Sequence, residues 1–535
     1  MAADKTNIVE NNELPVAMID VATSFADWLI ILPTTIALMG AALLIMLRFN
    51  KAIQAGLAIL IVIGIIILEI RLFLNVMEFG TQSMTMGKWL PPFGISFTVD
   101  VISIGFALAG AIVTLAVLIY AQADISSREV KYGFHSLVLL LLAGVTGAFM
   151  TGDLFNLYVW FEVMLIASFG LIIMGGRKIQ LDGAIKYGFL NFLATTFFLI
   201  SLGLIYGLFG TLNMADISQV SAQAPIGPLT AIGALLLLAF GMKGAAFPVN
   251  AWLPASYHTP HPAVSALFGG LLTKVGAYAL LRSLLLIMPS ARDFLDPVIT
   301  FLAIATLILA PLGALAQTNL RRAIGFLLIG GVGSVLVGLG VPTIRGVAGA
   351  SIYIFHSMLT ISALYLMAGL IERIMGTQDT RKMGGLYSAS SWLSILFLVL
   401  VFAVAGLPPF LGFWPKLLLI EASLSQGDVW LVVALVLNSL LTTIAGTRLW
   451  AHIFWRAGPI GENSEQQNKK LKPLTLREKY LCVTPTTILV LFIVFFGLKP
   501  AMIFDAGRMA AYGLLDKSEY VEVTGLADPT KEKVE

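Results

Sequence analysis

Four ionisable side chains stand inside stretches of the chain that are otherwise apolar. Lys243 and Lys274 lie in residues 240–278, FGMKGAAFPVNAWLPASYHTPHPAVSALFGGLLTKVGAY, and Glu162 lies in DLFNLYVWFEVMLIASFGL. Lys416 directly follows the sequence GLPPFLGFWP. A charged side chain inside a membrane costs at least about 3 kcal/mol unless it pairs with another charge or meets water. These four residues therefore point to a pathway for protons or ions.

The chemistry of such a pathway would be proton transfer between a carboxylate and amines. Glu162 stands about nine residues into its apolar stretch, near mid-depth at about 1.5 Å per residue. Lys243 and Lys274 are the cations that could pair with it. Burial favours the neutral forms of glutamate and lysine while pairing favours the charged forms, so a change of surroundings would move a proton. The alternative is a static buried ion pair that only fixes helix packing.

Three histidines could relay protons, because histidine changes its charge near neutral pH. His356 lies in the middle of an apolar stretch, YIFHSMLT, where a hydrogen-bonded core histidine is an equal alternative. His258 and His261 flank the turn Thr259-Pro260. They could form an entrance for protons or only shape the turn.

The remaining charges inside or beside apolar stretches favour structural roles. Glu421 follows Lys416 by just over one helical turn and is either a deep partner or an outer-interface residue. Glu69, with Arg71, is expected near a span end at the membrane interface. Arg282 is expected to snorkel toward the interface or to contact another subunit.

Composition settles the broad class of protein. Of 535 residues, 58% are hydrophobic and 12% are charged, about half the charged fraction of ordinary soluble domains. The chain is therefore predicted to be an all-α polytopic membrane protein. A formal charge of +3 indicates no nucleic-acid partner. One cysteine, scattered histidines and no phosphate-binding loop predict no cofactor and no metal site.

Apolar runs of about 20 residues predict about fourteen transmembrane helices. An acidic, polar extension, residues 1–27, precedes the first of them and lacks the features of a secretory signal. The expected spans are residues 28–48, 52–74, 99–121, 133–151, 153–175, 185–209, 229–257, 262–288, 297–317, 322–341, 345–371, 391–425, 429–455 and 482–504.

Two of these spans are predicted to be broken helices. Residues 229–257 and 391–425 are longer than one crossing needs, and each holds two prolines six residues apart. A proline removes a backbone donor and kinks or breaks a helix. Five spans separate the two segments, so they run in opposite directions. Broken helices in opposite orientation indicate an inverted repeat with functional groups near the midplane.

Basic residues predict the orientation of the chain. They gather in alternate loops, while the other loops hold almost none, and cytoplasmic loops carry the excess of lysine and arginine. Both termini are therefore expected on the extracytoplasmic side. The basic loops contain Arg48 and Lys51, Arg128 and Lys131, Arg177 and Lys178, Arg321 and Arg322, Arg373, Arg381 and Lys382, and residues 456–479.

The segments around these charged residues resemble the proton-translocating antiporter family. This family contains the large membrane subunits of respiratory complex I and the Mrp-type cation/proton antiporters. The resemblance covers essentially the whole chain and includes KGAAFPVNAWLPASYHTPHPAVSALFGGLLTKVGAYALLR, FNLYVWFE around Glu162 and GLPPFLGFWPK around Lys416. It implies fourteen helices, with helices 4–8 and 9–13 as inverted repeats and helices 7 and 12 discontinuous.

The resemblance also implies domains and residue roles. In one membrane domain, residues 1–535, the first repeat would be 133–288 and the second 297–455, followed by a last helix, 482–504, and a tail, 505–535. Glu162 would modulate Lys243, Lys274 would pass protons along the central axis, and Lys416 would be the terminal site. His356 would lie on the same axis.

The function that the resemblance implies is ion transport rather than enzymatic catalysis. The chain would be a proton-translocating subunit of a Na+/H+ antiporter in a bacterial cell membrane, driven by the proton gradient. Its partners would be the A, B, C, E, F and G subunits of an Mrp antiporter, and it would handle protons and Na+. The alternative is a proton-pumping subunit of a complex I-type or membrane-bound hydrogenase redox complex.

Overall fold

The computed structural model describes residues 24–87, 89–457 and 471–526. Within these ranges, twelve helices are long and apolar enough to cross a membrane, and two shorter apolar helices accompany them. Together they confirm the expected fold of about fourteen spans. Most of the predicted N-terminal extension (residues 1–23), part of the basic loop expected in the cytoplasm (458–470) and the end of the predicted tail (527–535) lie outside the described residues.

The first half of the chain contains the two strands and the first interrupted helix. Strand β1 (Gln82–Thr85) pairs antiparallel with β2 (Ser96–Val99). The helical elements are α1 (Phe25–Met46), α2 (Lys51–Phe79), α3 (Val101–Asp124), α4 (Ser127–Lys131), α5 (Phe134–Met150), α6 (Leu154–Ile173), α7 (Lys178–Phe209), α8 (Met214–Val220), η1 (Ser221–Gln223), α9 (Ile226–Gly244), α10 (Trp252–Ser256), α11 (Pro262–Leu267), η2 (Phe268–Leu272), α12 (Thr273–Leu281) and η3 (Arg282–Ile287).

The second half contains the second interrupted helix and the C-terminal helices. Its elements are α13 (Pro289–Phe294), α14 (Asp296–Ala316), α15 (Leu320–Gly340), α16 (Ile344–Met375), η4 (Thr380–Lys382), α17 (Leu386–Ala389), α18 (Ser391–Ala405), α19 (Phe413–Ser425), α20 (Val429–Trp450), η5 (Ala451–Trp455), α22 (Leu476–Glu478), η6 (Lys479–Val483), α23 (Thr484–Leu498), α24 (Ala501–Leu515) and α25 (Ser518–Val523).

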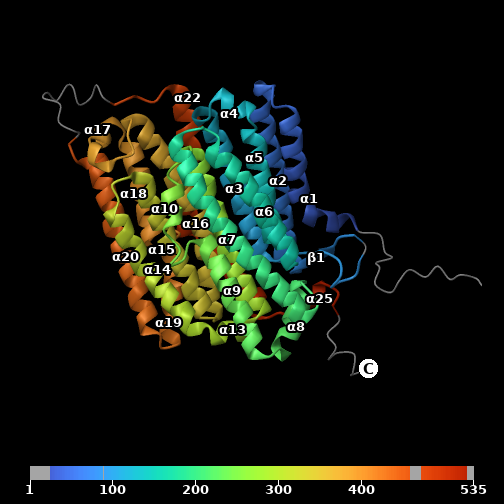
Figure 1. Cartoon of the computed structure of the whole chain (residues 1–535). Helices are drawn as coiled ribbons and strands as arrows, with labels where there is room; N and C mark the ends of the chain where they lie inside the picture. Colours follow the sequence, from blue (N-terminus) through green and yellow to red (C-terminus); the bar gives the residue numbers. More distant parts are fainter. Residues whose placement is uncertain (1–23, 88, 458–470, 527–535) are drawn as a thin grey trace, which may run out of the picture.

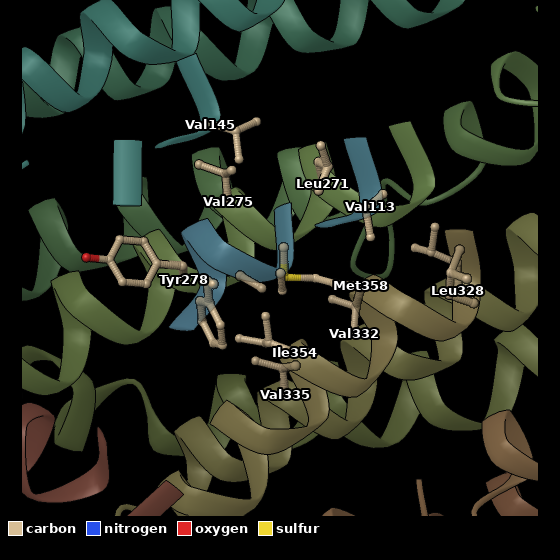
Figure 2. Packing of buried hydrophobic residues seen from close by; sticks show 14 of the residues in the cluster. Val113, Val145, Leu271, Val275, Tyr278, Leu328, Val332, Val335, Ile354 and Met358 are labelled. Carbon is tan, nitrogen blue, oxygen red and sulfur yellow. The ribbon is translucent and has the colours of Figure 1, made fainter. Parts of the chain in front are cut away.

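The long helices stand side by side in one elongated bundle (Figure 1). Helices α1 and α2 lie at one end of the bundle, and α18 and α20 lie at the other. The three most buried helical segments are residues 262–287, α15 and α16. Figure 2 shows apolar side chains that include Val113, Leu271, Val332 and Met358 packing together in the core. A dry core of this kind makes any charge inside it costly, which restricts charges to positions with partners.

Both broken helices are interrupted in the same way. Helix α9 ends at Gly244, and the next residue, Ala245, has a left-handed backbone with φ of 60°. Helix α18 ends at Ala405, and the next residue, Gly406, has φ of 82°. The chain resumes as α10 and α19 after a short irregular segment that contains the first proline of each pair, Pro248 or Pro409. The second proline, Pro254 or Pro415, lies inside the resumed helix. The predicted discontinuous helices are therefore confirmed.

Glu69, which is expected near a span end, faces the interior of the bundle. Its side chain is 0% exposed. The other fully buried residues of the same face of α2, Ile65 and Leu72, lie four residues before it and three after it, the spacing of one helical face. Helical periodicity therefore turns Glu69 into the bundle, whereas Arg71 two residues later is exposed.

The expectation for Arg282 is wrong, because its side chain is only 1% exposed. Its Nη1 forms an ion pair with Asp100 Oδ2 at 2.8 Å. The guanidinium lies 5.2 Å from the ring centres of both Tyr278 and Tyr520. Asp100 and Tyr520 are distant in the sequence, so the partners that allow Arg282 to be buried come from tertiary packing.

Candidate functional site

Lys243 lies in the last turn of α9, just before the break in the helix. Its side chain is 6% exposed, and its ammonium lies 4.5 Å from the centre of the Phe161 ring. The C-terminal end of a helix carries partial negative charge, and an aromatic face attracts a cation. The break in the helix therefore creates a place where a buried ammonium is tolerated.

Glu162 follows Phe161 on α6 and is half-buried. Among the described residues it forms no ion pair with Lys243 or with any other cation, although its neighbour Phe161 contacts the Lys243 ammonium. The carboxylate thus stands near the lysine without being fixed to it. This arrangement differs from the static ion pair that the sequence left open as an alternative.

A small cavity of about 20 Å³ lies beside Lys243. Its lining includes polar groups of Tyr187, Asn191 and Tyr257, and the Tyr257 hydroxyl has no hydrogen-bond partner in the described structure. A cavity of at least about 10–15 Å³ with several polar groups can hold one water molecule. The space next to Lys243 can therefore hold a water that exchanges protons with it.

Lys274 lies on α12, directly after the π-helical turn η2. Its Nζ donates to the Gly269 carbonyl at 2.7 Å and to Thr273 Oγ1 at 3.2 Å. A π-helical turn shifts backbone hydrogen bonds by one residue and often marks a functional site. Here it supplies a carbonyl to a lysine that is 4% exposed.

Lys243 and Lys274 are held on helices that touch each other. A β-carbon at Gly276 would lie only 3.1 Å from Lys243 Cβ and 3.1 Å from the Gly244 nitrogen. Glycine at this position therefore lets α12 approach α9 at the level of the break. The helices that carry the two lysines are therefore in direct contact at the level of the break.

Lys416 lies in the first turn of α19, where the helix dipole would disfavour a cation. The structure offsets this, because Nζ donates to the carbonyl of Ala405, the last residue of α18, at 3.0 Å. It also donates to Asn438 Oδ1 at 3.2 Å and to Ser439 Oγ at 2.9 Å. Both Lys243 and Lys416 therefore hold their charge at the carbonyl end of the first half of a broken helix.

His356 lies on α16, the helix that packs against both α12 and α19. Its side chain is buried, and its Nδ1 hydrogen-bonds Thr360 Oγ1 at 3.1 Å. Its Nε2 faces Gly412, at the break before α19, and would lie 2.8 Å from a β-carbon there. Lys243, Lys274, His356 and Lys416 are thus buried on helices that pack in series, α9 on α12, α12 on α16 and α16 on α19.

The two other histidines lie at the turn between α10 and α11 and are engaged in side-chain contacts. His258 Nδ1 contacts the Pro254 carbonyl at 2.9 Å, and Arg322 approaches Nε2 at 3.2 Å. Burial, together with the charge of Arg322, lowers the pKa of His258 to about 4. His258 is therefore neutral at pH 7 and accepts a hydrogen bond from Arg322.

His261 pairs with Glu129 of α4, with 2.7 Å between Nε2 and Oε1. Burial alone would raise the pKa of Glu129, but hydrogen bonds from Ser126 and the contact with His261 outweigh it and lower the pKa. Arg321 of α15 donates to the Pro260 carbonyl in the same turn. The turn is thus joined to helices of both halves of the chain.

Several residues of the site gave no signal in the sequence. Asn438 and Ser439, which bind Lys416, lie inside an apolar span where a single amide is unremarkable. Phe161 resembles any other core aromatic residue until the structure places it under Lys243. Glu421 is not a deep partner of Lys416, because it forms an exposed ion pair with Arg345 at 3.9 Å.

The site contains no cluster suited to a metal ion. No group of three or more metal-binding side chains occurs among the residues that the structure describes. Protonated lysines only donate hydrogen bonds and cannot ligate a cation. What the site can do is hold, release and pass on protons.

Comparisons with known proteins agree on one family. Residues 151–442 match the family described as NADH:quinone oxidoreductase/Mrp antiporter, transmembrane region. The chain is 38% identical over 496 residues to the D subunit of the Na+/H+ antiporter of Alkalihalophilus pseudofirmus, covering 92% of this chain and 98% of that protein.

Two solved structures show the same fold. A chain of the Mrp complex from Dietzia sp. DQ12-45-1b superposes with a TM-score of 0.87 at 26% identity, covering 94% of this chain and all of that one. A chain of respiratory complex I from Thermus thermophilus superposes with a TM-score of 0.79 at 21% identity, covering 91% of this chain and 99% of that one.

Proposed function

This chain belongs to the NADH:quinone oxidoreductase/Mrp antiporter family, and from that premise we propose that it is the proton-translocating subunit of a multisubunit Na+/H+ antiporter. The observation that carries the proposal is the set of buried lysines, Lys243 and Lys416 at the two helix breaks and Lys274 on α12, which packs against α9 and α16. The relative named as the D subunit of a Na+/H+ antiporter matches over nearly its whole length. At 21% identity, the likeness to complex I supports the fold alone.

The proposed mechanism moves protons without covalent chemistry. Lys243 takes up a proton through the water-sized cavity beside it, and the half-buried Glu162 carboxylate stabilises the ammonium when it comes closer. Two charges about 10 Å apart interact by about 1–2 kcal/mol at an effective dielectric constant of 20. Protonation of one lysine would therefore lower the proton affinity of another lysine at that separation by about tenfold.

Lys274, His356 and Lys416 complete the proposed pathway. Lys274 accepts the proton from Lys243 across the α9–α12 contact, and His356 connects it to Lys416. Lys416 is the terminal site, because its three oxygen acceptors hold the ammonium until the proton leaves. We propose that His258 and His261 shape the turn rather than carry protons, since the ring of each already contacts a charged side chain.

The two broken helices belong to the proposed inverted repeats, residues 133–288 and 297–455. The chain would lie in the bacterial cell membrane within a hetero-oligomeric complex of antiporter subunits, with both termini on the extracytoplasmic side. The basic residues of α4, Arg128 and Lys131, and those of η4 stand on one face of the bundle. That face would be cytoplasmic.

The proposal is tested by Na+-dependent proton flux in everted vesicles that contain the whole complex. Glu162→Ala, Lys243→Ala and Lys416→Ala are each expected to abolish antiport, because each removes one proton-binding group. Lys186→Ala is the matched control, since Lys186 pairs with Asp182 on the exposed surface of α7. It should leave antiport unchanged.

A measurement of complex assembly distinguishes a role of these charges in transport from a role in holding the complex together. Native gels of the membrane extracts should show the intact complex for all four variants. Normal antiport in Glu162→Ala vesicles would overturn the assignment. Loss of the assembled complex in the lysine variants, but not in Lys186→Ala, would instead show that the charges hold the complex together.

A further inference from the structure

Glu69 is a buried carboxyl group that the proton pathway does not use. It is 0% exposed on α2, outside both proposed repeats, and neither of its oxygens has a hydrogen-bond partner among the described residues. Most buried polar groups in proteins are paired, and an unpaired one calls for an explanation. A carboxylate in this position would have to be neutralised by a proton or by another cation.

Close packing at glycines shows which residues lie at the depth of Glu69. Gly105 of α3 packs on Phe73 of α2, so residue 109 lies at the level of Glu69 on these antiparallel helices. Gly110 packs on Val145 of α5, so Thr146 lies at the level of residue 109. Thr146 therefore stands at the depth of Glu69, on the neighbouring helix.

Helix α1 reaches the same level from the other side. Gly40 packs on both Ile61 of α2 and Leu139 of α5, so residue 32 lies opposite Glu69. Thr34 is about 3 Å along the helix axis from that level, at 1.5 Å per residue. Thr146 follows Leu139 by two turns and so lies on the face of α5 that contacts α1.

The two threonines share an unusual property with Glu69. Thr34 and Thr146 are each 1% exposed, and neither hydroxyl has a hydrogen-bond partner in the described structure. The neighbouring Thr35, by contrast, donates to the Ile31 carbonyl of its own helix at 3.0 Å. Two buried hydroxyls and one buried carboxyl thus remain unpaired at one level of the α1–α2–α3–α5 junction.

The backbone of α1 supplies a further oxygen at this level. Pro33 lies inside the helix and has no N–H group to donate to the Leu29 carbonyl. The freed carbonyl points along the helix toward residue 33 and lies within one helical turn of the level of Glu69. Carboxylate, hydroxyl and carbonyl oxygens are the ligands that hard cations take, and carbonyls freed from helices bind Na+ in transporters.

The other charged or titratable groups of these helices lie near the helix ends, are exposed, or are paired. His135 of α5 is near the cytoplasmic end, against Gln54, and Arg71 of α2 is exposed. Asp100, at the outer end of α3, is paired with Arg282. No ion pair of the described residues includes Glu69.

We propose that Glu69, Thr34, Thr146 and the Leu29 carbonyl form a monovalent-cation site that takes Na+ in exchange for a proton. In the exchange the Glu69 O–H bond breaks, the proton leaves and the carboxylate binds Na+, so the site stays neutral. The site rests on the proposed antiport function and adds the sodium partner that the lysines cannot supply.

The test is infrared difference spectroscopy of the purified complex in lipid, recorded on addition of Na+ at constant pH. The carboxylic acid band of Glu69 should disappear on addition of Na+, but not of choline, and should be absent from Glu69→Gln. Thr34→Val and Thr146→Val should each raise the Na+ concentration for half-maximal antiport by about fivefold. This is the effect of losing one ligating hydroxyl whose binding free energy is similar to that of one hydrogen bond. Thr35→Val is the matched control and should change nothing, because its hydroxyl is bound to its own helix.

Failure of this site and failure of the proton pathway give different results. The Glu162→Ala complex should lose antiport yet keep the Na+-dependent band of Glu69. A band that is present but insensitive to Na+, or one that persists in Glu69→Gln, would overturn the sodium site. Equal Na+ dependence of Thr34→Val, Thr146→Val and Thr35→Val would overturn it as well.

Discussion

Lys416 shows how single side chains make a buried charge tolerable. Its ammonium is 3% exposed and is surrounded by the Ala405 carbonyl, the Asn438 amide oxygen and the Ser439 hydroxyl. Asn438 is itself fixed, because its nitrogen donates to the Leu307 carbonyl at 2.7 Å. The amide therefore links Lys416 to α14 and sets where the proton is held.

Asn438→Ala should lower antiport by about tenfold or more. The change removes one acceptor of Lys416 and one donor to Leu307, and a hydrogen bond to a charged group is worth about 1.5–3 kcal/mol. Ser439→Ala is the milder comparison, since it removes one acceptor and disturbs no second residue. Proton flux in vesicles measures both, and wild-type flux in Asn438→Ala would contradict a positioning role.

Among single residues, the sequence predicted those that interrupt an apolar run with a charge. Lys243, Lys274 and Lys416 stand out because a charge in an apolar run is rare, and the structure places all three inside the bundle. The distance of Glu69 from the span end predicts an interfacial position. The face of the helix on which it lies places its side chain inside the bundle. Asn438 could not be predicted, since its importance depends on a contact with another helix.

At the scale of elements, the helix breaks determine the site. Proline pairs predicted both breaks, because loss of a backbone donor is a local property. The π-helical turn η2 was not predicted, although it supplies the Gly269 carbonyl to Lys274. Gly269 and Gly270 lie against Tyr365 and Ser362 of α16, so the turn depends on a tertiary contact that the sequence does not reveal.

Gly276→Ala tests whether the contact between α9 and α12 matters for transport. The added β-carbon would lie 3.1 Å from both Lys243 Cβ and the Gly244 nitrogen, so α12 must move away from α9. Overpacking of this kind costs about 1–3 kcal/mol, and the expected result is a strong loss of antiport. Gly203→Ala on α7 is the control, because nothing lies within 4 Å of its added carbon. Equal flux in the two variants would show that the contact is not required.

At the scale of the whole molecule, the two opposite faces of the bundle, where the helices begin and end, differ in charge. Helices α4 and α22 on one face carry Arg128, Lys131 and Arg477 against Glu129 and Glu478, while α8 and α13 on the opposite face carry Asp216 and Asp293 against Arg292. The loop charges predicted this asymmetry, since they do not depend on tertiary contacts. The way in which the C-terminal α25 covers Arg282 could not be predicted, because it joins distant parts of the chain.

The charge asymmetry leads to a test of orientation by labelling of introduced cysteines. Ala389 in α17 and Gln426 after α19 are both exposed and lie on opposite faces, and the natural Cys482 is buried. A membrane-impermeant maleimide should label Gln426→Cys in intact cells and Ala389→Cys only in everted vesicles, because the proposed orientation puts the basic face in the cytoplasm. In permeabilised cells both cysteines should be labelled, which would show that neither is covered by another protein of the complex. The reverse pattern would place both termini in the cytoplasm and would reverse the direction of every proton step proposed for the lysines.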